Sequence, residues 1–241
     1  MKQSVLLIGT ISILLFTSIF ISTASAMSSS TMSGKMAGMS HATKICFGKL
    51  TPHSDWSNCN MRYMNFAFHD LSGINLSGAN LQGVRLYDTN LAGANLTGAN
   101  LQFANLNFVN LSEANLIGAN LKYIDFYHAN LSYANLQNVD FTGSRFPTVN
   151  FQGANLDGVN FAGTDTELCN FQGANLKNAN FNQAQMFGDD FSDADLTNAN
   201  LSNGNFGGGG SMAGANLKDA IVSGIDTAGA DLSCTGNPIC H

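Results

Sequence analysis

Residues 91–110 read LAGANLTGANLQFANLNFVN, and an apolar residue stands at every fifth position of this stretch. The same spacing of leucine or phenylalanine continues from about residue 59 to residue 232. A helix cannot bury such a set on one face, because each step of five residues moves the side chain by about 140° around the axis. A straight strand cannot either, because successive leucines would lie on opposite faces. The pattern therefore predicts short strands separated by tight turns, with four such units closing a square coil.

The motif ANLxx or ADLxx recurs throughout the stretch, as in Ala79-Asn80-Leu81, Ala94-Asn95-Leu96, Ala174-Asn175-Leu176 and Ala194-Asp195-Leu196. With these blocks the chain resembles the pentapeptide repeat family. The resemblance implies an all-β fold, a right-handed quadrilateral parallel β-helix, with about 20 residues per coil and about eight coils. Both open ends of such a solenoid need a cap, because they expose core and unpaired strand edges.

Residues 20 positions apart should stack in neighbouring coils, which sorts the central residues into columns. One column is leucine throughout: Leu76, Leu96, Leu116, Leu136, Leu156, Leu176 and Leu196. Two other columns change from leucine to phenylalanine in the second half, at Phe151, Phe171 and Phe191 and at Phe141, Phe161 and Phe181. The sequence therefore predicts two phenylalanine ladders, in which offset stacking adds to burial.

The chain divides into five expected segments. Residues 1–26 combine one lysine, an apolar run and Ala24-Ser25-Ala26, which predicts a signal peptide removed after Ala26 and a periplasmic or secreted protein without a membrane span. A disordered leader rich in Met and Ser follows at 27–43, then an N-terminal cap at 44–58 with Trp56 as its lid. The repeats occupy 59–232 and a C-terminal disulfide cap 233–241.

The leader contains a possible metal site. Its thioether and imidazole side chains, Met32, Met36, Met39 and His41, are soft ligands that suit Cu(I), and the stretch resembles the Met/His tracts of exported copper-resistance proteins. The alternative interpretation is a leader without ligands.

Five cysteines in an exported chain suggest two bridges and one free thiol. Proximity and the need to close both ends favour the pairs Cys46–Cys59 and Cys234–Cys240. Cys169 stands at an inward position that elsewhere holds alanine, which predicts a buried, unreactive thiol.

Several positions depart from the repeat. Thr166 replaces a central apolar residue, so we expect a bulge, or a hydrogen bond from its hydroxyl to the backbone, to repair the coil. Asp189 stands at a nominally inward position, close in sequence to three further aspartates, Asp190, Asp193 and Asp195. This group predicts either a Ca²⁺ site or a local distortion of the coil with solvated carboxylates. His69 also stands at a nominally inward position, so we expect it to be a hydrogen-bonded residue of the core. The run GGGGS after Phe206 must absorb one extra residue.

Composition excludes several functions. The chain has 10 Lys and Arg against 16 Asp and Glu, a formal net charge of −6, and no basic patch, which argues against nucleic-acid binding. No catalytic constellation, cofactor motif or phosphate loop is visible, so we expect no enzyme and no cofactor. Some pentapeptide repeat proteins resemble duplex DNA and bind DNA gyrase, but the signal peptide and the mild charge disfavour that role. The sequence favours a non-catalytic exported scaffold or protein-binding solenoid, with metal handling through the leader as the alternative.

An exterior aromatic face is the expected partner-binding site. Nine aromatic residues of the repeats point outward: Tyr63, Phe68, Tyr87, Phe103, Phe108, Tyr123, Tyr127, Tyr133 and Phe187. In the 20-residue frame, Tyr63, Phe103 and Tyr123 share one corner, Tyr87, Tyr127 and Phe187 the adjoining face, and Phe68 and Phe108 the next corner with His128. Clustered exposed rings usually mark an interaction site. The face predicts a protein partner or a homodimer, unless the rings only shield the backbone of the corners.

Overall fold

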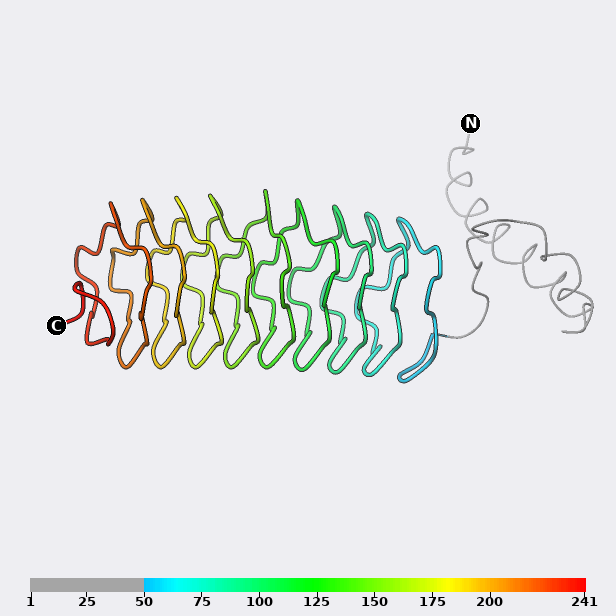
Figure 1. Ribbon diagram of the computed structural model, residues 1–241. Coiled ribbons are helices and arrows are strands. Elements are labelled where there is room, and N and C mark those ends of the chain that lie inside the picture. The colour runs from blue at the N-terminus through cyan, green and yellow to red at the C-terminus, as the bar shows by residue number, and fades with distance from the viewer. Residues whose placement is uncertain (1–49) are drawn as a thin grey trace, which may run out of the picture. The chain divides into compact units, whose positions relative to one another are not determined.

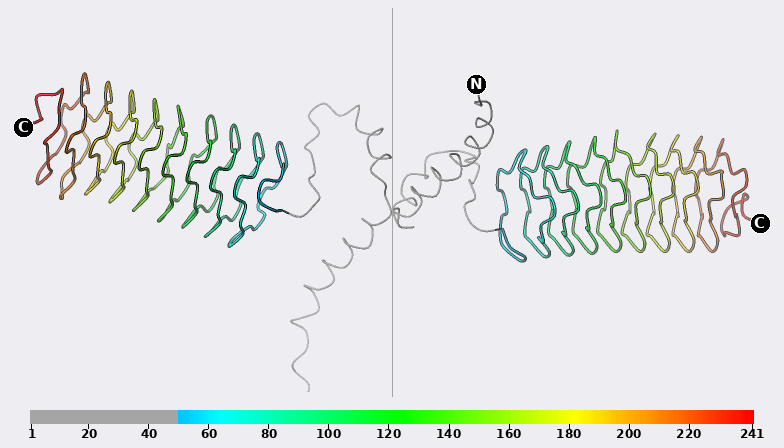
Figure 2. Two further views of the ribbon diagram at one scale, coloured as in Figure 1. Left: turned by 90° about the horizontal axis from the view of Figure 1, so that it is seen from below. Right: turned by 180° about the vertical axis from the view of Figure 1, so that it is seen from behind.

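A four-sided coil repeats along residues 50–241, which are the residues that the computed structural model describes (Figure 1 and Figure 2). These residues belong to one unit, Thr43–His241. The predicted signal peptide and leader at 1–43, and the first part of the predicted cap at 44–49, lie outside the described residues. Within 50–241, no helix is long and apolar enough to span a membrane.

Parallel β-bridges join each coil to the next. Asp55 pairs with Asn75, Asn75 with Asn95, and the pairing continues in steps of 20 residues, with a gap between Asn120 and Asp140 and with altered steps from Asp190 onward. A two-residue turn separates successive bridges, and residues 50–241 contain neither a helix nor a strand longer than one bridged residue. The prediction of a square coil built from four five-residue units is therefore confirmed.

The outward asparagines hold both the turns and the stack together. Asn95 Oδ1 accepts a hydrogen bond from the backbone N–H of Thr97 at 3.1 Å, and Asn95 Nδ2 donates to Oδ1 of Asn75 at 3.3 Å. A short amide can thus satisfy its own turn and also bond to the coil below. This double use explains why Asn or Asp precedes nearly every central residue of the repeat.

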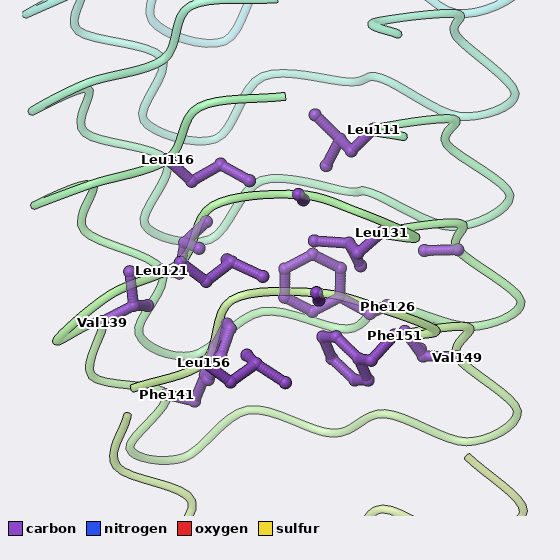
Figure 3. Packing of buried hydrophobic residues seen from close by; sticks show 14 of the residues in the cluster. Leu111, Leu116, Leu121, Phe126, Leu131, Val139, Phe141, Val149, Phe151 and Leu156 are labelled. Atoms are coloured by element: carbon purple, nitrogen blue, oxygen red, sulfur yellow. The ribbon is translucent and has the colours of Figure 1, made fainter. Parts of the chain in front are cut away.

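The predicted leucine and phenylalanine columns form the core (Figure 3). In one ladder Phe151 stacks on Phe171 at 4.9 Å between ring centroids, and Phe171 on Phe191 at 4.7 Å. In the other, Phe161 stacks on Phe141 at 5.0 Å and on Phe181 at 4.8 Å. Rings of the two ladders meet edge to face, for example Phe161 with Phe171 at 5.8 Å. Both phenylalanine ladders are confirmed.

The repeat geometry begins earlier than the sequence analysis placed it. Asp55 is already bridged, and the backbone N–H of His53 bonds to the carbonyl of Ser72 at 2.9 Å, so the coil includes part of the segment expected as a cap. Trp56 holds the central apolar position of its repeat and is 7% exposed. The sequence did not predict this repeat because Trp56 holds the central position that leucine or phenylalanine holds later.

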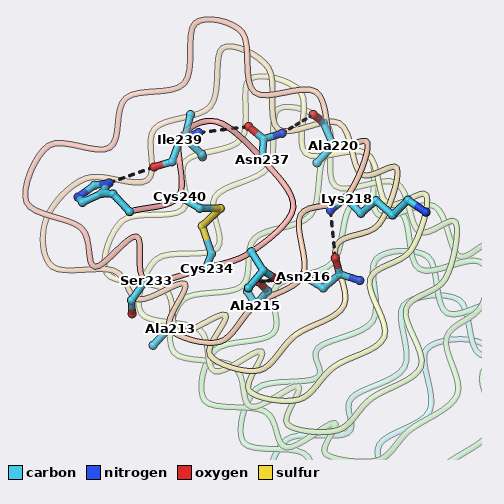
Figure 4. Close-up of a disulfide and its surroundings, with 12 residues drawn as sticks. Ala213, Ala215, Asn216, Lys218, Ala220, Ser233, Cys234, Asn237, Ile239 and Cys240 are labelled. Atoms are coloured by element: carbon cyan, nitrogen blue, oxygen red, sulfur yellow. Dashed lines mark hydrogen bonds between the residues drawn. A yellow bond between two sulfur atoms is a disulfide. The ribbon is translucent and has the colours of Figure 1, made fainter.

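One insertion and a disulfide mark the C-terminal end. Asp190 pairs with Ser211, 21 residues on, so the glycine run absorbs the extra residue as predicted, and Met212 takes the buried central position. Cys234 and Cys240 form the predicted disulfide, with their Cα atoms 4.9 Å apart (Figure 4). The closing segment packs on the core cluster through Ile239, Cys234 and Cys240. It is also tied to the last coils, because Asn237 Nδ2 donates to the carbonyl of Ala220 at 2.9 Å.

Candidate interaction surface

All nine outward aromatic residues are exposed at the surface of the solenoid, with exposed fractions from 37% for Tyr87 to 72% for Phe68. Each of them stands in a turn, at one of the corners of the coil. The expectation that these rings point away from the core is therefore confirmed.

The first aromatic corner carries Tyr63, Phe103 and Tyr123. Phe103 stacks on Tyr123 with 5.7 Å between ring centroids and 14° between ring planes. The guanidinium carbon of Arg62 lies 5.2 Å from the centroid of the Tyr63 ring, a cation–π contact. This corner therefore holds the three rings that the sequence placed together.

The second aromatic corner holds a chain of touching rings. Consecutive members alternate between the two positions of the turn, with centroid distances of 5.5 Å for Phe68–Tyr87, 5.3 Å for Tyr87–Phe108 and 5.7 Å for Phe108–Tyr127. His128 extends the chain, 5.2 Å from Phe108 and 4.1 Å from Tyr127. One expected placement is wrong: Tyr87, Tyr127 and Phe187 stand on the first turn residue of this same corner, not on an adjoining face. The reason is that the turn has two residues, which both lie at the corner.

The side of the coil between these two corners carries charged residues in its central column. Bridges connect Arg85, Asn105, Asp125, Arg145 and Asp165 in that order. We call this column, together with the rings Tyr63, Phe103 and Tyr123 of the first corner and Phe68, Tyr87, Phe108, Tyr127 and His128 of the second, the aromatic face. The charged column was missed because only apolar outward residues were considered. The 20-residue period alone would have placed Arg85, Asp125 and Arg145 together.

Two shallow hollows lie on the aromatic face, each of about 240 Å³. The first is lined by Phe103, Ala104, Asn105, Asn107, Tyr123 and Asp125. The second is lined by Asn107, Asp125, Tyr127, Arg145 and Pro147. Both combine ring edges with polar side chains, so the face offers apolar contact and hydrogen-bonding groups side by side.

The second residue of nearly every turn has a positive φ, which suits glycine and strains other residues. Phe103 and Phe108 nevertheless adopt φ of 60° and 59°, a left-handed conformation that costs a non-glycine residue about 1 kcal/mol. An aromatic residue at this position therefore needs a compensating contact.

Shielding supplies that contact for some of the rings. Three tyrosines lie over a glycine of the following coil: Tyr63 over Gly83, Tyr123 over Gly143 and Tyr133 over Gly153. In the same way Phe187 lies over Gly208. Phe68, Phe103 and Phe108 have no glycine at the equivalent place, where Asp88, Tyr123 and His128 stand. Shielding of the corner backbone thus explains several of the rings, but not these three phenylalanines.

A buried polar cluster lies at the repeat fault predicted around Thr166. The Thr166 hydroxyl donates to Asp189 Oδ2 at 2.6 Å, and Asp189 Oδ1 accepts the Cys169 backbone N–H at 2.8 Å. The predicted hydrogen bond to the backbone is also present, from the Thr166 hydroxyl to the carbonyl oxygen of Gln185 at 3.2 Å, and the bridges keep their 20-residue step there without a bulge. The expectation of solvated carboxylates is wrong for Asp189, which is 0% exposed. Burial raises the pKa of Asp189 well above its usual range and outweighs the two hydrogen bonds.

Cys169 is a free, buried cysteine, as predicted. Its thiol donates to the carbonyl of Phe146 at 2.8 Å, and burial, together with the nearby Asp189, raises the pKa of the Cys169 thiol well above its usual value. Such a thiol is closed to solvent and poorly ionised, so the cluster offers no reactive group to a substrate.

The prediction of a core histidine at position 69 is wrong. His69 is exposed, and its Nδ1 lies 2.8 Å from the carbonyl oxygen of Ala67. The inward slot holds apolar side chains as large as isoleucine, as at Ile74, so size alone does not exclude the imidazole. A polar side chain stays in this slot where it finds a hydrogen bond, as Thr89 does to the carbonyl of Phe66 at 2.8 Å. The imidazole of His69 turns outward instead.

Two predictions near the N-terminus concern residues that the structure does not describe. Met32, Met36, Met39 and His41, and also Cys46, lie outside the described residues. Cys59 is buried, and its pairing with Cys46 stays a prediction. In residues 50–241, no group of three or more His, Cys, Asp or Glu residues could hold a metal ion, and that range includes the aspartates around Asp189.

A family profile described as Pentapeptide repeats matches the chain in 8 copies, over residues 74–107, 110–146, 149–183 and 169–208. Together these matches cover more than half of the chain. Members of this family fold as right-handed quadrilateral β-helices, in agreement with the register of the bridges. The comparison with curated proteins gives no match.

Several solved structures resemble the chain. HetL, a pentapeptide repeat protein involved in heterocyst differentiation regulation in the cyanobacterium Nostoc sp. strain PCC 7120, is 24% identical with a TM-score of 0.36, over 79% of this chain and 94% of HetL. QnrB1, a plasmid-mediated fluoroquinolone resistance protein, is 17% identical with a TM-score of 0.39, over 71% of this chain and 90% of QnrB1. A pentapeptide repeat protein of the Arabidopsis thaliana thylakoid lumen is 30% identical with a TM-score of 0.16, over 45% of this chain and 65% of its own.

Proposed function

Because the chain belongs to the pentapeptide repeat family, we propose that its solenoid is a non-catalytic scaffold that binds a protein partner through the aromatic face. The rigid stack of coils holds the rings in fixed positions. Binding therefore requires little ordering of the surface, which lowers the entropic cost of association.

One observation carries this proposal. Phe68, Phe103 and Phe108 are 72%, 58% and 41% exposed, and Phe103 and Phe108 flank the same hollowed side of the coil. All three adopt positive φ without covering a glycine, so within the single chain only contacts with neighbouring exposed rings compensate their strain. Grouped exposed rings beside polar groups are typical of protein-binding surfaces.

The described part of the chain offers little to an enzyme. The side chains of Asp189 and Thr166, which bond to each other, and the thiol of Cys169 are enclosed and cannot meet a substrate. The hollows on the aromatic face are lined by Asn, Asp, Arg and aromatic side chains with no paired nucleophile and base. The proposal therefore assigns the face to binding and not to catalysis.

We further propose that the protein is exported, to the periplasm or out of the cell. The support is the sequence of residues 1–26, with its apolar run and the small residues Ala24-Ser25-Ala26. A disulfide between Cys234 and Cys240 is in keeping with an oxidising compartment. N-terminal sequencing of the protein recovered from culture medium or periplasm tests the proposal, and a chain that retains Met1 in the cytoplasm refutes it.

A variant with four rings removed tests the binding role. Phe103, Phe108, Tyr123 and Tyr127 are all replaced by serine, and the control replaces Tyr133 and Phe187, exposed rings away from the hollows. Both variants should keep the circular dichroism spectrum of the parent. Immobilised on a matrix and exposed to periplasmic extract, the control should retain the proteins captured by the parent and the four-ring variant should lose them. If the four-ring variant captures the same proteins as the parent, the working surface is elsewhere.

The Met/His leader supports metal handling as a second candidate function. Met32, Met36, Met39 and His41 supply soft ligands at short spacing. Titration with Cu(I) should give binding to the exported chain and none to a chain lacking residues 27–43, whose melting temperature we expect to be unchanged. Equal binding by both chains, or by neither, refutes this function.

A further inference from the structure

The aromatic face has an internal symmetry about one coil. Asn105 is bridged to Arg85 on one side and to Asp125 on the other, so opposite charges lie at equal distances from it. On the second corner, Tyr87 and Tyr127 stand at equal distances from Asn107 along the stack. Asp88 and His128 stand in the same way on either side of Phe108. Each of these pairs is complementary in charge or in ring chemistry.

The charges of this column are not neutralised within the chain. Arg85 and Asp125 are exposed, and neither side chain makes a hydrogen bond or an ion pair with the described residues. Arg145 follows Asp125 in the column but forms no ion pair with it. Elsewhere the described chain does pair its charges across coils, as Lys122 does with Asp140 at 2.7 Å.

Two arrangements allow the same flat side of two copies to meet about a two-fold axis. If the rods run parallel, every residue of the central column meets its own equivalent, and Arg85 and Asp125 then face like charges, which costs several kcal/mol. If the rods run antiparallel, residues at equal distances on either side of the axis meet instead. An axis beside Asn105 then brings Arg85 opposite Asp125.

We propose that the aromatic face binds the same face of a second copy of this chain, with the rods antiparallel and the two-fold axis beside Asn105. This inference rests on the proposed function, because it names the partner of the same surface. Three complementary contacts then occur twice each: Arg85 with Asp125, Asp88 with His128, and Tyr87 with Tyr127 of the second copy. Phe103 and Phe108 meet their own equivalents at the axis, which accounts for exposed rings that shield no glycine.

The size of the face sets the expected affinity. Coils are stacked about 4.8 Å apart, so the five coils from Tyr63 to Arg145 and their two corners offer roughly 500 Å² per copy. Stable interfaces bury about 800 Å² per partner. The dimer should therefore be weak, and its population should depend on concentration and, through the charge pairs, on salt.

A charge exchange tests the arrangement. Sedimentation velocity of the exported chain, from about 10 µM to about 1 mM at low salt, should show a monomer–dimer equilibrium. R85D and D125R each place like charges opposite each other twice, so each should raise the dissociation constant of its own homodimer about tenfold or more. An equimolar mixture of the two variants restores both pairs and should form a heterodimer about as tight as the parent homodimer.

R145D is the matched control, because Arg145 lies opposite Asn65 in this arrangement and the change is the same as in R85D. It should weaken the dimer less than R85D does. If R145D disrupts the dimer and R85D does not, or if the mixture of R85D and D125R fails to recover dimer, the axis beside Asn105 is wrong.

A parent chain that stays monomeric at about 1 mM also overturns the inference. The proposed function would survive that result if the four-ring variant still loses a captured protein. It would fail together with the inference if the parent stays monomeric and either captures no protein or captures the same proteins as the four-ring variant.

Discussion

Replacing Phe161 with leucine tests whether the phenylalanine ladders stabilise the solenoid beyond plain burial. Phe161 is fully buried and stacks between Phe141 and Phe181, at centroid distances of 5.0 Å and 4.8 Å. Its ring also meets three further rings at 5.4 to 5.8 Å, those of Phe146, Phe151 and Phe171. One substitution therefore removes five aromatic contacts.

The magnitude follows from these contacts. An aromatic pair contributes about 0.5 kcal/mol or more beyond the area that it buries, so the five pairs together contribute about 2.5 kcal/mol. Leucine keeps most of the buried apolar area and regains part of the contact energy, while the smaller side chain leaves a void with its own cost. We expect Phe161→Leu to lower the free energy of unfolding by about 2 kcal/mol.

Guanidinium unfolding followed by circular dichroism measures this loss. Phe187→Leu makes the same chemical change at a ring that is 46% exposed, and it should alter the free energy of unfolding by less than about 0.5 kcal/mol. Because a solenoid is stabilised by neighbouring coils, hydrogen exchange should show the loss concentrated in the coils around residues 141–181. A Phe161→Leu chain as stable as the Phe187→Leu control would refute a separate contribution from stacking.

Three further outcomes are expected from the described residues. Asp189 has a raised pKa in the folded chain, so its contribution to stability is fully present below its ordinary pKa of 3.8 and is lost as the pH rises, by up to about 1.4 kcal/mol per pH unit. In Asp189→Asn this pH dependence should be absent when the free energy of unfolding is measured in urea between pH 4 and 7. An unchanged dependence would show that another group causes it. The Cys169 thiol should react with a disulfide reagent only as fast as the chain unfolds, and rapid labelling of the native protein would contradict its burial. Cys240→Ser opens a short loop, so it should cost less than about 3 kcal/mol and raise hydrogen exchange mainly in residues 217–241; exchange raised along the whole rod would show that the disulfide supports more than its own end.

The fold could be predicted closely because one residue spacing determines it. Neither a straight helix nor a straight strand can bury Leu91, Leu96 and Leu101 on one face, because they are five residues apart. A coil of four units can, and the bridges show it. The change from Leu131 to Phe151 in one column predicted a ladder that the structure contains. In each case residues 20 positions apart lie in neighbouring coils, so the sequence alone shows which side chains are in contact.

The errors arose where the same slot receives side chains of different size or polarity. His69 and Asp189 both occupy the small inward position, yet His69 turns outward and Asp189 stays buried. The difference depends on hydrogen-bond partners, because Thr166 and the backbone of Cys169, in the preceding coil, donate two hydrogen bonds to Asp189. The period shows which residues are neighbours, but it does not show whether a polar group finds enough hydrogen bonds to stay buried. The aromatic face was foreseen only in part for a related reason, since its charged column was hidden among asparagines.

The backbone strain at the corners shows which residues would gain most from a partner on the aromatic face. At the second turn position glycine carries no strain, and Gly93, Gly98 and Gly118 hold it with open space around them. A phenylalanine there costs about 1 kcal/mol and also exposes apolar surface to water, so two unfavourable terms coincide at Phe103 and Phe108. Within one chain, only contacts between rings that remain about half exposed compensate these two costs. A second surface that covers these rings would recover the burial of the exposed halves, which at about 25 cal/mol per Å² is comparable with the strain. The residues that make the isolated coil less favourable are thus the ones whose burial by a partner would bring the largest gain.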